Sequence, residues 1–283
     1  MDITKIIVSD CSHWGNTLFK FWLAQCYEKG AKIVTSQHGG SICEGMPNDM
    51  NFQEAISDKY ISWSKPLSEK QIQLTPLKFA GRNYNFKNYN YKYISYLALN
   101  RPRYIIRCER AADSGQIFLH HEQTLEFFKG LNKISKNKFR IRPYPSINSW
   151  GLANDYIKYF GKSKVSQSRN YYSFLESSSI IICSYPETTF SECISRNIPT
   201  ILLYPECLWE SHKFILPTLK KLKKANIIFH DPVLAARHVN CVNENPLEWW
   251  NSSEVINALE EFREVALPNS RNWLLSYKNF LKE

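Results

Sequence analysis

The sequence predicts an α/β protein built on doubly wound parallel sheet. Short apolar, β-branched runs alternate along the chain with segments of helical periodicity, which is the pattern of a sheet covered by helices. Residues 5–9, 16–27 and 31–36 give a strand, a helix and a strand, a βαβ unit whose connection should be right-handed. Residues 178–204 repeat this order, with a polar turn between the strand and the helix. Parallel sheet is therefore expected.

The elements of the first third each have a local reason. Asn16 is a candidate N-cap for the helix over 16–27, and Gly30 ends that helix. A short helix near residues 54–56 and a strand over 59–63 follow. Residues 67–93 are polar and rich in Asn and Lys, so we expect them to bridge two lobes.

Strands and helices alternate again after this bridge. The further strands are predicted at residues 103–107, 138–142, 180–182, 200–204 and 225–229. The further helices are predicted over residues 121–131, at 171–175, from 187 onward, over 212–224 and between 232 and 282.

The chain is basic, with a formal net charge of +10 over 283 residues. Its lysines are spread, apart from a denser patch between residues 213 and 224. A solvated helix face is the first interpretation of this patch, and attraction to anionic lipid headgroups is the second. No RNP aromatics, zinc finger or basic helix leading into a zipper is present, so no nucleic-acid partner is expected.

Cysteine usage and hydropathy favour a cytoplasmic protein, with peripheral contact at the inner face of the membrane as an extension. The eight cysteines contain no C-x-x-C pair and lie among apolar neighbours, which is typical of reduced thiols. No apolar run is long enough to span a bilayer, and the first ten residues lack a signal-peptide pattern. No Walker loop, G-x-G-x-x-G, G-x-S-x-G or metal triad occurs, so neither a metal nor another cofactor is expected.

The first candidate site lies where the strand at residues 180–182 meets a helix start. Ser184, Thr188 and Thr189 place hydroxyls beside helix N-terminal amides, an arrangement that binds phosphate, although an ordinary capped helix explains them as well. Glu192 follows one turn later. We interpret it as poorly placed for the core and well placed to accept hydrogen bonds from ribose hydroxyls. The segment therefore predicts a site for a nucleotide-linked donor.

The second candidate site is the Gln-His-Gly-Gly loop at residues 37–40. Paired glycines directly after a buried strand allow close approach of the backbone to a ligand. His38 lies at the strand end, where open α/β sheets bind ligands, and could act as general base or hydrogen-bond donor. A turn histidine satisfied by backbone is the alternative. Glu44 and Glu54 are candidate partners of His38, and either fits a surface carboxylate equally well.

Arginines end two of the predicted strands. Arg107 and Arg110 close the strand at residues 103–107, while Arg140 and Arg142 close the next. Arginine at the carboxyl end of a parallel strand faces the crevice and suits bidentate binding of phosphate. A salt bridge at the rim explains any one of them as well.

Six stretches of the chain, which include both candidate sites, resemble a family of bacterial surface-carbohydrate transferases related to Kdo transferases and, more remotely, to CDP-glycerol glycerophosphotransferases. The matching stretches keep their order over most of the chain. They are residues 19–45 (FKFWLAQCYEKGAKIVTSQHGGSICEG), 54–63 (EAISDKYISW), 140–146 (RIRPYPS), 186–210 (PETTFSECISRNIPTILLYPECLWE), 235–240 (AARHVN) and 248–251 (EWWN).

The resemblance implies a GT-B-like fold, two Rossmann-like lobes with the active site between them. Residues 1–75 would form the acceptor-side lobe and residues 76–283 the lobe that binds the nucleotide sugar. His38 and Glu44 would be catalytic, and no metal would be bound, since basic side chains and helix dipoles would stabilise the leaving phosphate. The donor-binding residues implied are Gln37, Gly39, Gly40, Arg142, Ser184, Thr188, Thr189 and Glu192.

The sequence departs from this family in its N-terminal half, which is much longer in family members. The N-terminal lobe is therefore expected to be truncated, and a partner chain could supply the missing half. The favoured function is transfer of a sugar from a nucleotide donor, plausibly CMP-linked and Kdo-like, to a surface glycan or lipid-linked acceptor. The alternatives are a truncated non-catalytic or split-enzyme lobe that binds nucleotide, and a CDP-glycerol-type alditol-phosphate transferase.

Overall fold

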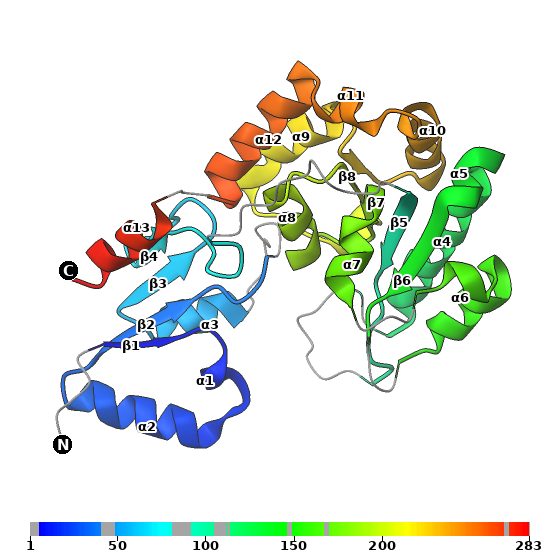
Figure 1. Ribbon diagram of the computed structural model, residues 1–283. Helices are drawn as coiled ribbons and strands as arrows, with labels where there is room; N and C mark the ends of the chain where they lie inside the picture. The colour runs from blue at the N-terminus through cyan, green and yellow to red at the C-terminus, as the bar shows by residue number, and fades with distance from the viewer. Residues whose placement is uncertain are drawn as a thin grey trace.

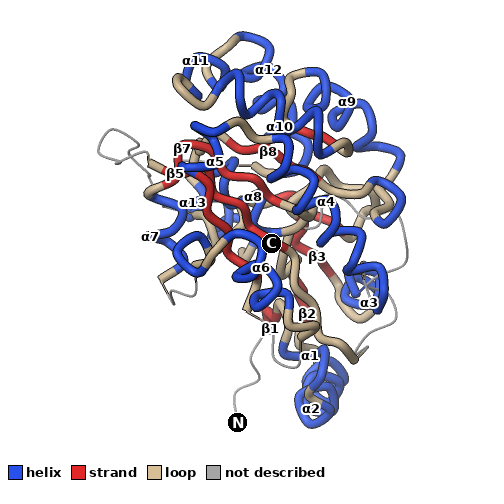
Figure 2. The backbone as a smooth tube through the Cα atoms, turned by 90° about the vertical axis from the view of Figure 1, so that its right-hand side faces the viewer, coloured by secondary structure: helices blue, strands red, loops and turns tan. Residues whose placement is uncertain are grey.

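The protein contains two separate parallel β-sheets with helices packed against them (Figure 1). This computed structural model describes residues 6–40, 49–80, 92–104, 112, 114–145, 149–166, 170–268 and 272–282. The two sheets lie side by side in Figure 1, and the first lies below the second in the turned view of Figure 2. The predicted α/β class with parallel sheet is confirmed.

The first sheet has four parallel strands in the order β1-β2-β3-β4. Its strands are β1 (Ile6–Ser9), β2 (Lys32–Ser36), β3 (Lys59–Ser62) and β4 (Gln71–Gln73). Its helices are α1 (Ser12–Gly15), α2 (Thr17–Glu28) and α3 (Asp49–Ala55). The predicted cap of α2 is confirmed, because the side chain of Asn16 accepts a hydrogen bond from the Phe19 amide at 3.0 Å.

The second sheet has five parallel strands in the order β6-β5-β7-β8-β9. Its strands are β5 (Tyr93–Ala98), β6 (Phe139–Pro143), β7 (Ser178–Cys183), β8 (Thr200–Leu203) and β9 (Ile228–Phe229). From β5 the chain steps to β6 on one side and then returns to β7 on the other. The carboxyl ends of β5 and β7 therefore form the topological switch point, where open sheets leave a crevice for ligands.

Helices cover both faces of this second sheet, with α4 and α5 on one side in Figure 1 and α8 on the other. They are α4 (Ile117–Gly130), α5 (Lys133–Lys138), α6 (Leu152–Phe160), α7 (Tyr171–Glu176), α8 (Thr188–Ser195), α9 (Leu216–Lys224), α10 (Pro232–Val242), α11 (Pro246–Trp250) and α12 (Ser253–Ala266). Because both faces are covered, β7 is buried along its whole length.

The two sheets differ in how much core they carry. One contiguous apolar core runs through the second sheet and includes the fully buried Ile94, Ile141 and Ile181. The first sheet has only two small clusters, one around Ile33 and one around Ile61.

The C-terminal helix α13 (Trp273–Phe280) packs against the first sheet, far from it in sequence (Figure 1). Tyr277 and Phe280 contact the cluster around Ile61, and the Tyr277 hydroxyl donates to the Thr75 carbonyl oxygen at 3.0 Å. The boundary at residues 75 and 76 stays a prediction. Across the described residues, no helix combines the length and apolarity needed to cross a membrane.

β5 is a central strand of the second sheet, and the sequence reasoning missed it. Only its first residue, Tyr93, lies in the predicted bridge; no element was predicted for residues 94–98, and a strand was predicted at residues 103–107 instead. Arg103 and Tyr104 lie in a bend, and residues 105–107, like Arg110, fall outside the described residues. β5 is apolar on both faces because it lies between β6 and β7 under helices, so no alternation of polar residues marks it.

Candidate functional site

A cavity of about 400 Å³ opens at the switch point of the second sheet. Residues that follow β5, β6 and β7 form most of its wall, while His38 and Lys78 approach from the side of the first sheet. The lining consists of His38, Lys78, Leu97, Ala98, Leu99, Asn100, Arg101, Arg142, Tyr144, Pro145, Tyr171, Tyr185, Glu187, Thr188, Thr189 and Glu192.

The N-terminus of α8 forms one wall of the cavity. Glu187 precedes the helix in extended conformation, and its carboxylate forms an ion pair with Arg101 instead of capping the helix. The backbone amides of Thr188 and Thr189 have no hydrogen-bond partner among the described residues. Two amides at the positive end of a helix dipole suit an anion, and binding of phosphate there stays a prediction.

The paired glycines of the 37–40 loop press against the first turn of α8. The Gly40 amide donates to Thr188 Oγ1 at 3.0 Å, joining the two lobes. A Cβ on Gly39 would lie 2.7 Å from Thr188 Oγ1, and a Cβ on Gly40 would lie 2.8 Å from Ser191 Oγ. A side chain at either position would therefore force the loop or these neighbouring side chains to shift. The close approach of the two glycines is made to α8, and neither glycine lines the cavity.

His38 is paired with a carboxylate that the sequence reasoning missed. Its Nδ1 lies 3.0 Å from Asp10 Oδ2, and its ring packs edge-on against Trp14. Asp10 follows β1 as His38 follows β2, and these neighbouring parallel strands end at the same edge. Burial acts to raise the pKa of Asp10, but hydrogen bonds with His38 and Cys11 outweigh it and hold that pKa below its usual value. With Nδ1 donating to Asp10, Nε2 keeps the lone pair.

Two predicted site residues brace the loops behind the cavity. Gln37 accepts from the Trp63 amide at 2.8 Å and donates to the Gly39 carbonyl oxygen at 2.8 Å. The buried Ser184 Oγ accepts from the Leu99 amide at 2.7 Å, which ties the ends of β5 and β7 together. Neither residue lines the cavity. Glu44 lies outside the described residues.

Arg142 and Glu192 do line the cavity, and both are buried. The Arg142 guanidinium lies within 6 Å of the Tyr171 and Phe174 rings, and its burial lowers its pKa. Glu192 is only 4% exposed, and its Oε1 accepts from Arg196 Nη2 at 2.9 Å. Our interpretation of Glu192 as poorly placed for the core did not foresee Arg196, whose charge permits the burial. A role for Glu192 at ribose stays a prediction.

Two residues that line the cavity each carry a buried polar atom with no partner among the described residues. Asn100 Oδ1 and the Tyr171 hydroxyl have no hydrogen-bond partner within the part of the chain that the structure describes. Buried polar atoms are nearly always paired in native proteins, so these two fit groups of a bound molecule. Asn100 was not predicted because it lies just beyond the carboxyl end of β5, a strand that the sequence reasoning missed.

The charges of the lining favour an anionic ligand. Lys78, Arg101 and Arg142 supply three cations against two carboxylates. Both carboxylates already pair with arginines, Glu187 with Arg101 and Glu192 with Arg196. A ligand that carries phosphate would therefore meet net positive charge as well as the open amides of α8.

Residues 2–281 match the sequence profile described as LIC12162 family transferase. The chain belongs to this family. Its members are transferases, and an enzymatic role for the chain follows. No curated protein shows a significant match to the sequence.

Solved structures share the fold of this LIC12162 family chain at low identity. A glycosyltransferase from Rickettsia africae is 12% identical, with a TM-score of 0.51 over 98% of this chain and 76% of its own. A candidate UDP-N-acetylglucosamine 2-epimerase from Listeria monocytogenes is 9% identical, with a TM-score of 0.53 over 98% and 75%. The wall teichoic acid polymerase TagF is 10% identical, with a TM-score of 0.46 over 90% and 69%. The GT-B-like fold with two parallel sheets is confirmed.

Proposed function

We propose that the chain transfers a sugar from a nucleotide donor to an acceptor of cell-surface glycan synthesis. The observation that carries this proposal is the cavity itself: an anion-binding helix start at a switch point, approached by the His38–Asp10 pair from the other lobe. Membership of a transferase family supports a group transfer. The resemblance to Kdo transferases makes a CMP-linked sugar the first donor to test.

The second lobe holds the donor in this proposal. The amides of Thr188 and Thr189 receive the phosphate oxygens, and the cations of the lining offset their charge. Asn100 Oδ1 and the Tyr171 hydroxyl bind polar groups of the donor. The two amides and the cations are in place before the reaction. The negative charge that develops on the leaving phosphate is therefore stabilised without reorganisation.

The first lobe activates the acceptor. An acceptor hydroxyl attacks the anomeric carbon, the bond from that carbon to the phosphate oxygen breaks, and the nucleotide leaves with the electron pair. His38 Nε2 accepts the hydroxyl proton, while Asp10 holds the ring and stabilises its charged form. Asp10 is thus a positioning residue in this mechanism.

Thermal-shift titration of the full chain with CMP, CDP, UDP and GDP tests the donor site. We expect selective stabilisation by one of them, with CMP first, because a ligand that binds only the folded state raises apparent stability by mass action. The variant Asn100→Ala should weaken that response, since it removes an unpaired cavity acceptor. A chain that responds to none of the four nucleotides contradicts the proposal.

His38→Ala tests the chemical step. We expect the release of nucleotide from the donor to fall about 10²- to 10⁴-fold, the usual contribution of a general base. Nucleotide-induced stabilisation should persist, because His38 is half exposed and belongs to the acceptor side. His212→Ala is the matched control, because His212 is exposed and lies outside the cavity lining. Full turnover in His38→Ala would remove the base assignment.

A further inference from the structure

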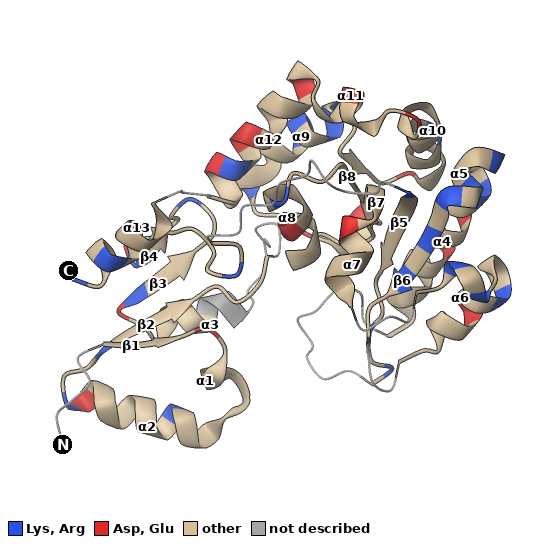
Figure 3. Cartoon of the chain, viewed as in Figure 1, with Lys and Arg blue, Asp and Glu red and all other residues tan. Residues whose placement is uncertain are grey.

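Helix α2 is apolar on nearly all sides. It carries only two charged residues, Lys20 and Glu28, and appears almost entirely in the colour of uncharged residues in Figure 3. A helix that is apolar all round is normally buried. In α2, however, Leu18 is 80% exposed and Phe21 is 68% exposed. This helix therefore presents apolar surface beyond what its own sheet covers.

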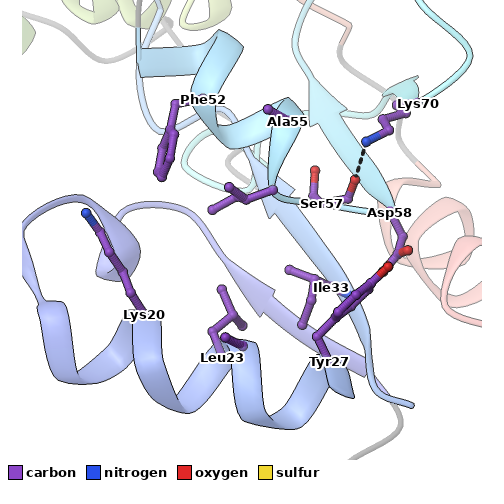
Figure 4. Close-up of a pocket in the computed structure, with 11 residues that line it drawn as sticks. Lys20, Leu23, Tyr27, Ile33, Phe52, Ala55, Ser57, Asp58 and Lys70 are labelled. Carbon is purple, nitrogen blue, oxygen red and sulfur yellow. Dashed lines mark hydrogen bonds between the residues drawn. The ribbon is translucent and has the colours of Figure 1, made fainter. Parts of the chain in front are cut away.

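Between α2 and α3 lies a groove of about 480 Å³ (Figure 4). Leu23 and Ala24 of α2 form one wall, Ala55 and Ile56 form the other, and Ile33 of β2 lies between them. These five side chains are all aliphatic. The volume falls within the range of small-molecule sites, which are mostly apolar and carry few polar groups.

The polar groups of the groove lie at its two ends. At one end, the Asp58 carboxylate accepts a hydrogen bond from the Ile33 amide at 2.7 Å, and the Lys70 ammonium donates one to the Ser57 carbonyl oxygen at 2.9 Å. Both charged groups therefore already have hydrogen-bond partners within the protein. At the other end, the Lys20 ammonium lies 5.5 Å from the Phe52 ring. Lys20 is exposed, and no carboxylate among the described residues pairs with it. The groove thus ends in an unneutralised cation.

This cationic end points toward the candidate active site. The Phe52 ring contacts His13 at 6.4 Å between centroids, and the Trp14 ring next to His13 contacts His38 at 5.2 Å. A continuous row of ring contacts therefore joins the Lys20 end of the groove to the catalytic candidate His38. The row of rings gives the direction in which a group bound at Lys20 would extend toward His38.

We propose that the groove binds the apolar chain of the acceptor, and that this acceptor is a lipid with an acidic headgroup. The chain lies along Leu23 and Ala24, the anionic head meets Lys20, and the glycan attached to the head extends toward His38. The assignment as an acceptor rests on the proposed sugar transfer. The ligand chemistry itself, an aliphatic chain with an anionic head, follows from the aliphatic walls and from Lys20, which has no carboxylate partner among the described residues.

Isothermal titration of the full chain with alkyl phosphates, each below its micelle concentration, tests the groove. Decyl phosphate should bind, and butyl phosphate should bind at least about 30-fold more weakly because fewer methylenes leave water. Decyl maltoside, with the same chain and a neutral head, should bind about tenfold more weakly than decyl phosphate, and Lys20→Gln should remove that difference. Equal affinities for decyl and butyl phosphate would overturn the proposal.

Matched tryptophan variants place the chain in the groove. Ala24→Trp fills the groove from an exposed position and should abolish decyl phosphate binding. Gln25→Trp adds the same bulk to α2 outside the groove lining and should leave binding unchanged. Binding that survives Ala24→Trp but is lost in Phe21→Ser would assign the chain to the outer face of α2 and overturn the groove.

This test fails independently of the donor site. Nucleotide stabilisation without decyl phosphate binding would remove the lipid acceptor and leave the sugar transfer standing. Decyl phosphate binding without any nucleotide response would leave the groove as a lipid site and remove its role in sugar transfer.

Discussion

The two lobes carry similar parallel sheets but very different amounts of core. Around the second sheet, one continuous cluster joins five strands to eight α-helices among the described residues, and most of its members are fully buried. Around the first sheet, the buried side chains separate into two small clusters, while Leu18, Phe21 and Trp22 of α2 face outward. Helical cover is nearly complete on one sheet and partial on the other.

This difference separates two roles within one chain. The second lobe has enough core to form a rigid support, and the candidate donor site lies on strand ends and a helix start that this core holds. The first lobe depends on contacts from outside its own sheet, such as α13 and the Gly40–Thr188 hydrogen bond. It also contains the open groove. Four experiments test this contrast, in order of decreasing expected effect.

The largest loss of stability is expected from breaking the buried ion pair of the second lobe. Glu192→Ala leaves the Arg196 guanidinium buried at 3% exposure without its carboxylate, so we expect unfolding free energy to fall by about 3–5 kcal/mol. Urea denaturation measures this change. The double variant Glu192→Gln, Arg196→Met is the control and should recover most of the loss. If Glu192→Ala costs less than about 1 kcal/mol, the pair does not hold this lobe.

Equivalent leucine truncations in the two lobes should differ in their effect. Leu222 of α9 is fully buried in the large core, and Leu222→Ala should cost about 4 kcal/mol because it leaves a closed cavity. Leu23 lines the groove, so Leu23→Ala enlarges a space that is already open and should cost about 2 kcal/mol. Denaturant titration of both variants compares them. Equal losses of unfolding free energy would show that the open groove does not reduce the cost of truncating Leu23.

Adding a single methyl group at Gly40, where the two lobes meet, should lower the stability of the protein. In Gly40→Ala, the new Cβ would lie 2.8 Å from both Ser191 Oγ and Trp63 Cζ3, so the 37–40 loop must move away from α8. We expect a loss of about 1–3 kcal/mol, measured by thermal and urea unfolding. Gly15→Ala is the control, because nothing lies within 4 Å of a Cβ there. Unchanged stability in Gly40→Ala would mean that the close contact is not retained in solution.

The smallest effect is expected at Asp10. Its pKa is lowered in the folded state, so its ionised form contributes stability above the unfolded pKa of about 3.9, and that stability disappears as pH falls through the folded value. Asp10→Asn should therefore be less stable than the parent at pH 7, by less than about 1 kcal/mol because the pair is half exposed. The difference should shrink as pH falls below the unfolded pKa and disappear once Asp10 is protonated in the folded state. A constant difference at all pH values would exclude the ionised pair as its source.

Local sequence signals were sufficient for most of the fold. The Asn16 cap and the β-branched run of β7 each depend on nearby residues and were predicted correctly. β5 was missed because burial on both faces removes alternation, and that burial depends on strands distant in sequence. Because β5 was not predicted, Asn100 and Arg101 were not recognised as residues at the carboxyl end of a strand.

Pairings across the chain account for the rest of the candidate site. His38 and Glu192 were recognised from their own neighbours, but the charged partner of each was missed. Asp10 reaches His38 because β1 and β2 are adjacent, and Arg196 neutralises Glu192 one helical turn along. Gln37 and Ser184 were expected to touch the ligand and instead brace loops. A single sequence contains no distance information that separates these two roles.

The return of α13 to the first sheet restricts how the lobes can move. The chain passes between the lobes twice, once before β5 and once after α12, so two covalent links join them. Hydrogen bonds near the second link, from the Lys65 amide to Val265 and from the Gln73 side chain to Glu264, hold the lobes together along that edge. We expect opening to be a rotation about this edge, which widens the opposite side to admit the donor and then swings His38 back over it.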